Sequence, residues 1–326
     1  MTELALDIRK VSHRFGHDVL AVDDVSFQVE AGEVFGLVGP DGAGKSTLIR
    51  MLATVLMPSH GDAEVFGHSV CKDAGGVKPR IGYMSQQFSL YPDLTVRENL
   101  AFFANLRGVP RGEVASRSKR LLEFAGLTEF AKRQAQYLSG GMKQKLALAV
   151  TLIHEPDLLF LDEPTTGVDP VSRREFWRII AGLHQQGITV FVATPYMDEA
   201  ERCSHVAFME GGRILFRDTP AGLKASVPGT LYELVVSDQR HAVRQLAEEP
   251  WTLASTVYGD VVRTVVGNGG PGAEGVRDAL SLAGIGVESI APARVDMEAT
   301  FAFLAEETRK ANIETAAARE REEAVT

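Results

Sequence analysis

The chain has 326 residues, a length that suggests two domains. Its net charge of −9 argues against broad binding to nucleic acid, because such binding needs a surplus of Lys and Arg. No apolar run approaches the length that spans a bilayer and the N-terminus lacks a secretory apolar segment, so we expect a membrane role only through a partner. Cys71 and Cys203 occur without CxxC or His–Cys spacing, which indicates thiols in a reducing compartment.

The first segment predicts an antiparallel sheet. Residues 4–35 alternate short apolar runs with turns, and the run Val25–Val29, for example, stands before Ala31-Gly32. Short runs of this kind, separated by turns, are typical of antiparallel strands. We expect this sheet to form a layer on the core that follows.

A glycine-rich loop follows an apolar run, Val34–Val38, and precedes a predicted helix over Leu48–Leu52. The loop has the sequence Gly39-Pro40-Asp41-Gly42-Ala43-Gly44-Lys45-Ser46-Thr47. Strand, loop and helix in this order are typical of a phosphate-binding loop, although an ordinary strand–turn–helix is the alternative. Glycines let backbone N–H groups converge on phosphate oxygens, and the helix N-terminus adds partial positive charge. We expect Lys45 to reach the β- and γ-phosphates and Ser46 to ligate Mg²⁺.

The next region predicts a helical subdomain over about residues 88–150. Val96–Leu106 and Glu113–Phe124 have helical periodicity, and Gly108-Val109-Pro110 separates them. The segment Leu138-Ser139-Gly140-Gly141-Met142-Lys143-Gln144 closes this region, and Ser139 is the predicted N-cap of the helix that follows. A capped helix N-terminus with two glycines is also an anion site, so the structural and functional interpretations agree.

Two carboxylates follow the apolar run Leu158–Leu161, which predicts a buried parallel strand. They are Asp162 and Glu163, with Pro164 after them. Ligands of open α/β sheets bind at the carboxyl ends of strands. We therefore expect Asp162 to hold Mg²⁺, through water, and Glu163 to polarise the attacking water. The alternative is that Asp-Glu-Pro only ends the strand at a turn.

The order of phosphate loop, LSGG and LDEP resembles the ATP-binding subunit of ABC transporters over roughly residues 4–220. The resemblance implies an α/β fold, namely an ABC-type P-loop ATPase domain with an antiparallel β layer and a helical subdomain. It also implies ATP and Mg²⁺ as cofactors. Two chains would sandwich two ATPs, and each site would join the Lys45 loop of one chain to Ser139, Gly140 and Gly141 of the other.

Three further residues match positions of that family. Phe15 matches the aromatic residue that stacks on adenine, with a core aromatic as the alternative. Gln86 matches the glutamine that contacts Mg²⁺ and water and couples to the membrane partner; Gln87 leaves a one-residue ambiguity, and a surface amide is the alternative. Asp169 matches the D-loop, which crosses the dimer interface.

The family also places membrane-subunit docking on the helical subdomain. The expected contact residues are aromatic or apolar: Phe88, Leu90, Tyr91, Phe102 and Phe103. Their alternative is packing within the helical core. The resemblance thus implies a peripheral protein on the cytoplasmic side of the inner (cell) membrane.

One position departs from the family. After the predicted strand 188–193, the MDEAE context fixes the register, so that Pro195 stands where the family has a histidine contacting the γ-phosphate. Proline has neither a side-chain donor nor a backbone N–H. We therefore expect the chain's own ATP site to be hydrolytically weakened. The alternative is that the histidine is dispensable because Glu163 is present.

The remaining elements divide at residue 227. The ATPase domain, 1–227, is expected to close with a helix Ser172–Gln185, the strand 188–193, a short helix Met197–Cys203, a hairpin around Gly211-Gly212 and a helix Pro220–Val227. Residues 228–326 predict strand 231–237, helix 240–248, strands 252–258 and 261–266, helix 275–283 and strand 287–291. This order suggests a ferredoxin-like α+β domain. A charged helical tail follows, solvated over 317–323.

The loop sequence GPDGAGK and the replacement of the histidine most resemble multidrug or antibiotic efflux ATPases of the bacterial ABC-2 type. Our first hypothesis is an ATP-hydrolysing exporter subunit that drives separately encoded ABC-2 type membrane subunits, as a homodimer or with a second ABC ATPase, for drug or lipophilic-compound efflux. A degenerate regulatory partner of another ABC ATPase is the second. A non-transport ABC ATPase is the third, although the coiled-coil insertions or tandem cassettes usual there are missing from the sequence.

Overall fold

The computed structural model describes residues 3–16, 18–87 and 90–308. The chain divides into two compact units, Met1–Arg217 and Asp218–Thr326. The boundary lies earlier than residue 227, so the helix α8 (Pro220–Ala225) belongs to the second unit. The reason is packing, since Val227 after this helix lies in an apolar cluster with residues of the second unit.

The first unit begins with the predicted antiparallel layer, whose strand order is β2-β1-β4-β5. Its strands are β1 (Leu4–Phe15), β2 (Val19–Glu30), β4 (His60–Val65) and β5 (His68–Ser69). Buried and exposed positions alternate along much of β1 and β2, because one face covers the core.

The second sheet has the order β10-β9-β3-β8-β7-β6 and carries the phosphate loop. Its strands are β3 (Val34–Val38), β6 (Ile81–Met84), β7 (Leu158–Asp162), β8 (Thr189–Thr194), β9 (His205–Glu210) and β10 (Arg213–Asp218). Neighbours from β9 to β6 run parallel. The strands β3, β7 and β8 are buried at every position, as their continuous apolar runs predict for strands covered on both faces.

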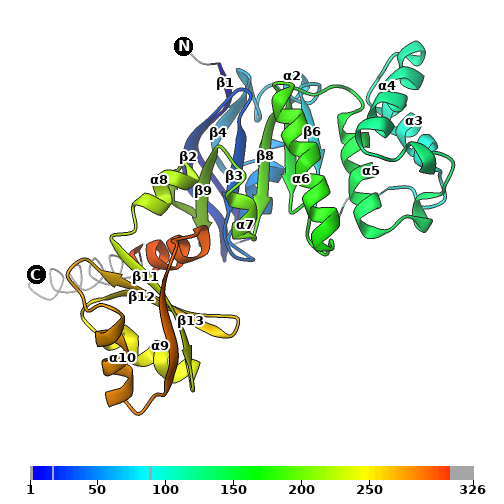
Figure 1. The fold of residues 1–326 in the computed structure, drawn as a ribbon. Helices are drawn as coiled ribbons and strands as arrows, with labels where there is room; N and C mark the ends of the chain where they lie inside the picture. The colour runs from blue at the N-terminus through cyan, green and yellow to red at the C-terminus, as the bar shows by residue number, and fades with distance from the viewer. Residues whose placement is uncertain (1–2, 17, 88–89, 309–326) are drawn as a thin grey trace, which may run out of the picture. The chain divides into compact units, whose positions relative to one another are not determined.

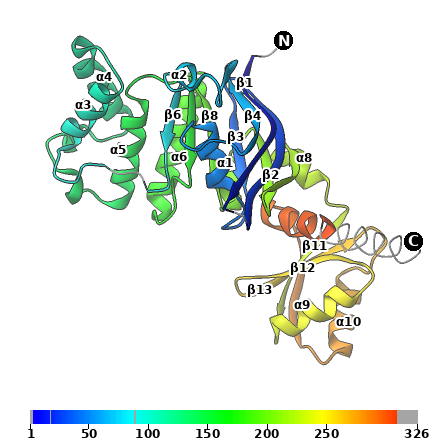
Figure 2. The ribbon, with the colours of Figure 1, turned by 180° about the vertical axis from the view of Figure 1, so that it is seen from behind.

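One apolar core joins the two sheets and the helix α1 (Lys45–Leu52) between them. Figure 2 shows α1 beside β3. Three aromatic rings stack across this core, with centroids 5.2 Å apart for Phe27 and Phe35 and 5.3 Å for Phe35 and Phe191. The core therefore fixes the strand ends at which the motif residues stand.

Three other helices complete this part: α2 (Ala74–Val77), α6 (Pro170–Gln185) and α7 (Met197–Ala200). The prediction of a helix as far as Cys203 is wrong, because the chain turns after α7 to bring Cys203 against β3. A Cβ placed on Gly36 of that strand would lie 2.8 Å from the Cys203 Sγ. Among the described residues, no helix is both long enough and apolar enough to cross a membrane.

The predicted helical subdomain is present beside β6 (Figure 1). It contains α3 (Val96–Leu106), α4 (Arg111–Phe124), α5 (Gly140–Leu152) and two 3₁₀ turns (Thr128–Phe130 and Ala135–Tyr137). Its core is separate and includes Leu100, Leu122 and Leu146. A capping box starts α3, since the Glu98 backbone donates to Thr95 and the Thr95 backbone donates to Glu98.

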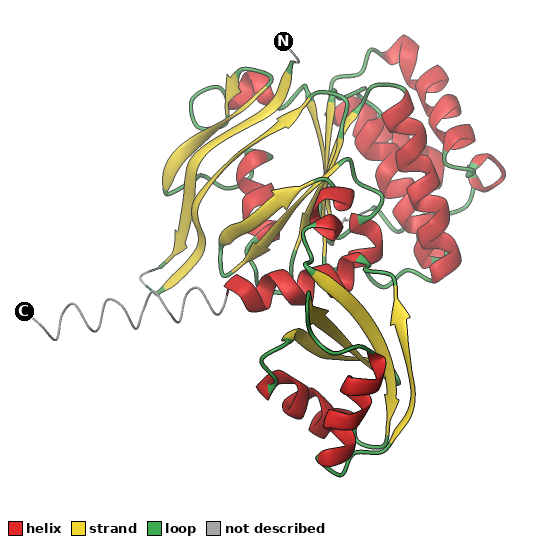
Figure 3. Ribbon diagram, turned by 60° about the vertical axis from the view of Figure 1, so that its left-hand side comes forward, coloured by secondary structure: helices red, strands yellow, loops and turns green. Residues whose placement is uncertain are grey.

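The second unit has a four-stranded antiparallel sheet of order β12-β13-β11-β14. Its elements are β11 (Gly229–Val236), α9 (Gln239–Glu248), β12 (Thr252–Tyr258), β13 (Val261–Gly267), α10 (Ala273–Leu282) and β14 (Val287–Ala293). This is the predicted β-α-β-β-α-β order. Figure 3 shows the helices of this unit, in red, beside its strands. On β11, Leu234 packs toward α9 and α10, whereas Leu231 packs with Phe303 of a helix over 297–308. The charged tail predicted beyond it falls outside the described residues.

Candidate functional site

The phosphate loop lies between β3 and α1, as its sequence predicts. Gly44 has a φ of 104°, and a Cβ there would lie 2.2 Å from the Ala21 carbonyl oxygen, so only glycine fits. The loop borders a cavity of about 300 Å³. The cavity is lined by Ala21, Asp41, Gly42, Ala43, Gly44, Lys45, Ser46, Thr47, Gln86 and Glu163. Gly39 lies at the start of the loop, where its carbonyl faces the Lys45 ammonium.

The Lys45 side chain is almost fully buried and is held by its own loop. Its Nζ donates to the carbonyl oxygens of Gly39, at 2.8 Å, and Pro40, at 2.9 Å, and lies 3.9 Å from Glu163 Oε1. Burial lowers the pKa of Lys45, and the nearby carboxylate of Glu163 opposes that shift. A positive charge is thus positioned at the cavity where a phosphate would enter.

Ser46 and Asp162 meet at the C-terminal end of β7. The Ser46 Oγ donates to Asp162 Oδ1 at 2.8 Å. The Asp162 Oδ2 is buried, and among the described residues it has no hydrogen-bond partner. Burial raises the pKa of Asp162, because the charged carboxylate loses its hydration. A hydroxyl beside an unpartnered buried carboxylate oxygen is a donor set that suits Mg²⁺, which prefers oxygen ligands.

Glu163 follows directly and has a positive φ of 49°, which is strained for a residue with a Cβ. Its backbone N–H donates to the Ala193 carbonyl at 2.9 Å. Its carboxylate accepts from Gln86 Nε2 at 2.9 Å and from Thr166 Oγ1 at 3.2 Å. Because Gln86 contacts Glu163, the geometry favours Gln86 over Gln87 as the glutamine of the predicted site. Sequence reasoning missed Thr166, whose link to Glu163 depends on the turn.

Phe15 ends β1 with 45% of its surface exposed, so its ring is not enclosed in the core. One edge contacts the His13 ring, with centroids 4.5 Å apart. The opposite strand pairs Val19 with it. An exposed ring held from one side is available to stack on a base.

Ser139 caps α5, as predicted, and its Oγ accepts from the Met142 N–H at 3.3 Å. Asp169 caps α6 in the same way and accepts from the Ser172 N–H at 3.0 Å. The two helix starts touch, since a Cβ on Gly141 would lie 2.4 Å from Ser172 Oγ.

The site residues thus form two groups. We call Lys45, Ser46, Asp162 and Glu163 the phosphate-loop group, and Ser139, Gly140, Gly141 and Asp169 the signature group. Within residues 3–16, 18–87 and 90–308, no hydrogen bond or ion pair joins one group to the other.

Pro195 follows the last residue of β8 and is half-buried. The backbone N–H of Tyr196 donates to Thr194 Oγ1 at 3.1 Å, which turns the chain away from the strand. Pro195 therefore stands on the loop directly after β8.

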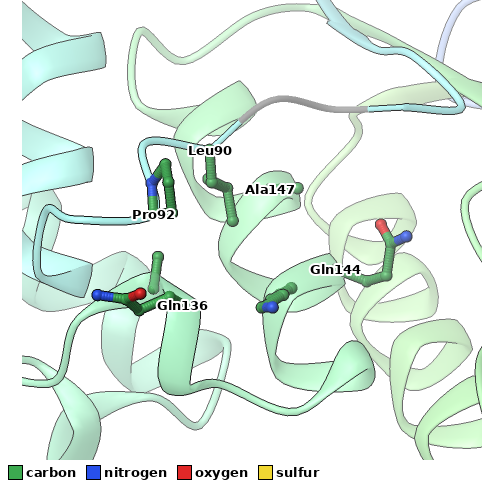
Figure 4. Close-up of a pocket in the computed structure, with 7 residues that line it drawn as sticks. Leu90, Pro92, Gln136, Gln144 and Ala147 are labelled. Atoms are coloured by element: carbon green, nitrogen blue, oxygen red, sulfur yellow. The ribbon is translucent and has the colours of Figure 1, made fainter.

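A second cavity, of about 230 Å³, opens beside α5 (Figure 4). It is lined by Leu90, Pro92, Ala135, Gln136, Lys143, Gln144 and Ala147. Figure 4 shows Leu90 pointing into it toward the α5 residue Ala147.

An exposed aromatic cluster lies near Leu90 in the sequence. Tyr91 contacts Phe102, with centroids 4.5 Å apart, and Phe102 contacts Phe103 at 5.4 Å. Tyr91 and Phe102 are 45% and 38% exposed, so neither is fully used by core packing. Phe88 lies outside the described residues.

Fold and site together define an α/β nucleotide-binding protein with a phosphate loop. The sequence profile of the family described as ABC transporter matches residues 22–166. The daunorubicin resistance ATP-binding protein DrrA3 of Streptomyces coeruleorubidus is 35% identical over 313 residues, which cover 95% of this chain and 98% of DrrA3. The chain belongs to the ATP-binding proteins of ABC transporters, a family of ATPases.

Two other similarities show the extent of the match. The probable multidrug ABC transporter ATP-binding protein YbhF of Escherichia coli (strain K12) is 44% identical over 223 residues, 68% of this chain. These residues are 38% of YbhF, so this chain matches less than half of that relative's length. The solved structure of cbiO1 from Clostridium perfringens, part of the ABC transporter complex cbiONQ, has a TM-score of 0.63 at 26% identity. It covers 69% of this chain and 92% of cbiO1.

Proposed function

We propose that this chain is the ATP-hydrolysing subunit of an exporter and drives separately encoded ABC-2 type membrane subunits. The observation that carries the proposal is that Lys45 and Glu163 of the phosphate-loop group line one cavity together with Gln86. The contacts of this group are the ones that phosphate binding and water activation require.

The roles of the residues follow from these contacts. The Lys45 ammonium exchanges its two loop carbonyls for the β- and γ-phosphate oxygens. Ser46, Asp162 and Gln86 would hold Mg²⁺, which neutralises phosphate charge when it is bound. The Glu163 carboxylate accepts the proton of the attacking water, and Gln86, which already donates to that carboxylate, orients the water.

The signature group supports a dimer. Gly140 and Ser139 are exposed at the N-terminus of α5, where backbone N–H groups can bind an anion, yet they make no contact with their own phosphate-loop group in the described residues. We propose that Ser139, Gly140, Gly141 and Asp169 complete the ATP site of a second chain. That chain is another copy of this protein or a homologous ABC ATPase.

Pro195 supports a dimer whose two ATP sites differ in activity. It offers no donor to a γ-phosphate, so the site of this chain is slow, while its signature group remains intact for a partner. This observation also keeps a second candidate function, a nucleotide-binding regulatory partner of a more active ABC ATPase.

The aromatic cluster and the second cavity support docking to a membrane subunit. Tyr91 and Phe102 are large, exposed and adjacent, and such aromatic surfaces are typical of protein interfaces. The cavity is lined by Gln144 and Ala147 of α5, the helix that Ser139 caps. A shift of a docked membrane subunit would therefore move α5, and with it the signature residues at the start of that helix.

The names of the relatives support the class of cargo. DrrA3 is named for daunorubicin resistance and YbhF for multidrug transport. We propose drug or lipophilic-compound efflux, with this chain on the cytoplasmic side of the cell membrane.

Co-purification with a co-expressed ABC-2 type membrane subunit tests the proposal. Tyr91→Glu should release that subunit and leave ATP binding intact, because the cluster lies outside the phosphate-loop cavity. Leu282→Glu, at a side chain 91% exposed in the second unit, is the control for an added surface charge. Retention of the membrane subunit by Tyr91→Glu places docking elsewhere, and absence of ATP hydrolysis by every complex refutes the exporter ATPase.

A further inference from the structure

Glu199 is a fully buried carboxylate that the roles above do not use. It lies on α7, and its relative exposure is 0%. Burial of a carboxylate is costly unless its oxygens accept hydrogen bonds. Both oxygens do: Thr165 Oγ1 donates to Oε1 at 2.5 Å, and Thr194 Oγ1 donates to Oε2 at 2.6 Å.

The two threonines stand at the ends of two neighbouring strands, next to Glu163 and Pro195 respectively. Thr165 is in the turn that follows Glu163, and Thr194 ends β8 immediately before Pro195. One carboxylate therefore bridges the ends of β7 and β8. Both hydroxyl-bearing residues are buried, at 1% and 0% exposure, so water does not replace these contacts.

The bridge extends on both sides. Tyr196 N–H donates to Thr194 Oγ1 at 3.1 Å, so the same chain of hydrogen bonds fixes the loop on the far side of Pro195. From α6, Arg173 places its Nε 3.9 Å from Glu199 Oε1 and its guanidinium 4.1 Å from the Tyr196 ring centroid. Four elements of the first unit thus meet at this carboxylate.

Glu163 needs such support, because its φ of 49° costs energy that its surroundings must supply. Thr166, next to Thr165, donates to the Glu163 carboxylate. A shift of this turn would therefore move both the Glu163 backbone and the hydroxyl that orients its side chain. On the other loop, Pro195 has neither a backbone N–H nor a side-chain donor with which to anchor itself.

We propose that Glu199 is a positioning residue for ATP hydrolysis, which holds the Glu163 turn and the Pro195 loop in register through Thr165 and Thr194. The inference rests on the proposed role of Glu163. It requires that loss of the bridge slows the chemical step and leaves ATP binding unchanged, because Lys45 and Phe15 lie on other elements.

The test is turnover and ATP affinity of the purified full chain, with enzyme at a concentration that allows slow phosphate release to be followed. Thr165→Val and Glu199→Ala should each lower kcat by about 10- to 100-fold, because small misplacements of catalytic groups have effects of this size. The Kd for ATP and KM should stay within about twofold. Glu199→Gln should recover most of the loss, since its carbonyl accepts one hydroxyl and its amide can donate to the other.

Thr300→Val is the matched control, because it also removes a buried threonine hydroxyl, one that donates to the Asp296 carbonyl in the second unit. Its kcat should equal that of the wild type. If Glu199→Ala does not fold, Thr165→Val, which is nearly isosteric, decides alone. The inference is overturned if kcat is unchanged, or if kcat and ATP affinity fall together in proportion to lost thermal stability. Wild-type turnover that Glu163→Gln does not reduce would instead refute the proposed role of Glu163.

Discussion

The phosphate-loop group and the signature group differ in how complete they are within one chain. In the first, Lys45 binds its own loop, and Ser46 contacts the carboxylate of Asp162. In the second, Ser139 and Asp169 cap helices, and neither residue lines the phosphate-loop cavity. The difference teaches that the contacts of the first group are complete within one chain, whereas the second group gains a role at an ATP site only through the dimer that we propose.

The largest expected effect concerns Pro195 and tests whether the two groups act in different sites. Pro195→His should raise turnover of the purified chain by about 10²–10³-fold, because one charge-stabilising donor is restored. In a complex with a histidine-bearing homologue, Ser139→Arg should reduce ATPase activity more than Glu163→Gln, because it damages the partner's site. Brisk activity of the unmodified chain, abolished by Glu163→Gln, would show that a histidine is not needed and that the sites are equivalent.

A smaller effect is expected from Lys45→Ala, which removes the charge from the assembled group. Loss of a charge-assisted contact costs about 1.5–3 kcal/mol, so the affinity for an ATP analogue should fall about 10- to 100-fold. Equilibrium binding measures it, with Lys132→Ala, at an exposed lysine, as the control. Unchanged affinity in the folded variant would remove Lys45 from the site.

Phe15→Ala should have a weaker effect on the same equilibrium. Stacking of a base on an aromatic ring contributes about 1–3 kcal/mol, and the exposed ring adds little to stability. Phe102→Ala, at a comparably exposed phenylalanine of the helical subdomain, should leave ATP affinity unchanged. A fall in thermal stability with no change in affinity would assign Phe15 to packing.

The smallest expected effect is on thermal stability. It tests whether the phosphate-loop group keeps a buried carboxylate for its ligand at the expense of the stability of the nucleotide-free protein. The raised pKa of Asp162 means that the folded state binds this proton more tightly than the unfolded state does. Ionisation of buried Asp162 therefore lowers the free energy of unfolding as pH rises through the raised pKa. The full loss of stability is present at higher pH.

Asp162→Asn should therefore raise the melting temperature of the nucleotide-free protein at neutral pH by about 2–4 °C, for a gain on the order of 1 kcal/mol. The gain should vanish at acid pH, and stabilisation by Mg²⁺ with ATP should be lost. Thermal unfolding across pH measures both, with exposed Asp93→Asn as the control. A destabilised Asp162→Asn protein would contradict the assignment.

The sequence predicted what local patterns determine. Val34–Val38 and Leu158–Leu161 are continuous apolar runs, so their burial and the placement of the motifs at their ends followed from periodicity. The Thr165–Glu199–Thr194 bridge could not be predicted, because Thr165 is distant in the sequence from the other two and all three residues are ordinary in type. The unit boundary was missed for a similar reason, since only packing assigns Val227 to the second unit.

The carbonyl contacts of Lys45 have a consequence for the catalytic cycle. Because the carbonyl oxygens of Gly39 and Pro40 already hold the Lys45 ammonium, the loop itself fixes the position of the charge that phosphate would meet. When ADP leaves, the loop would then stay ordered. Binding of the next ATP would exchange the two carbonyl oxygens around Lys45 for phosphate oxygens. We expect refilling of each loop to be fast, so that it does not limit the rate of such a cycle.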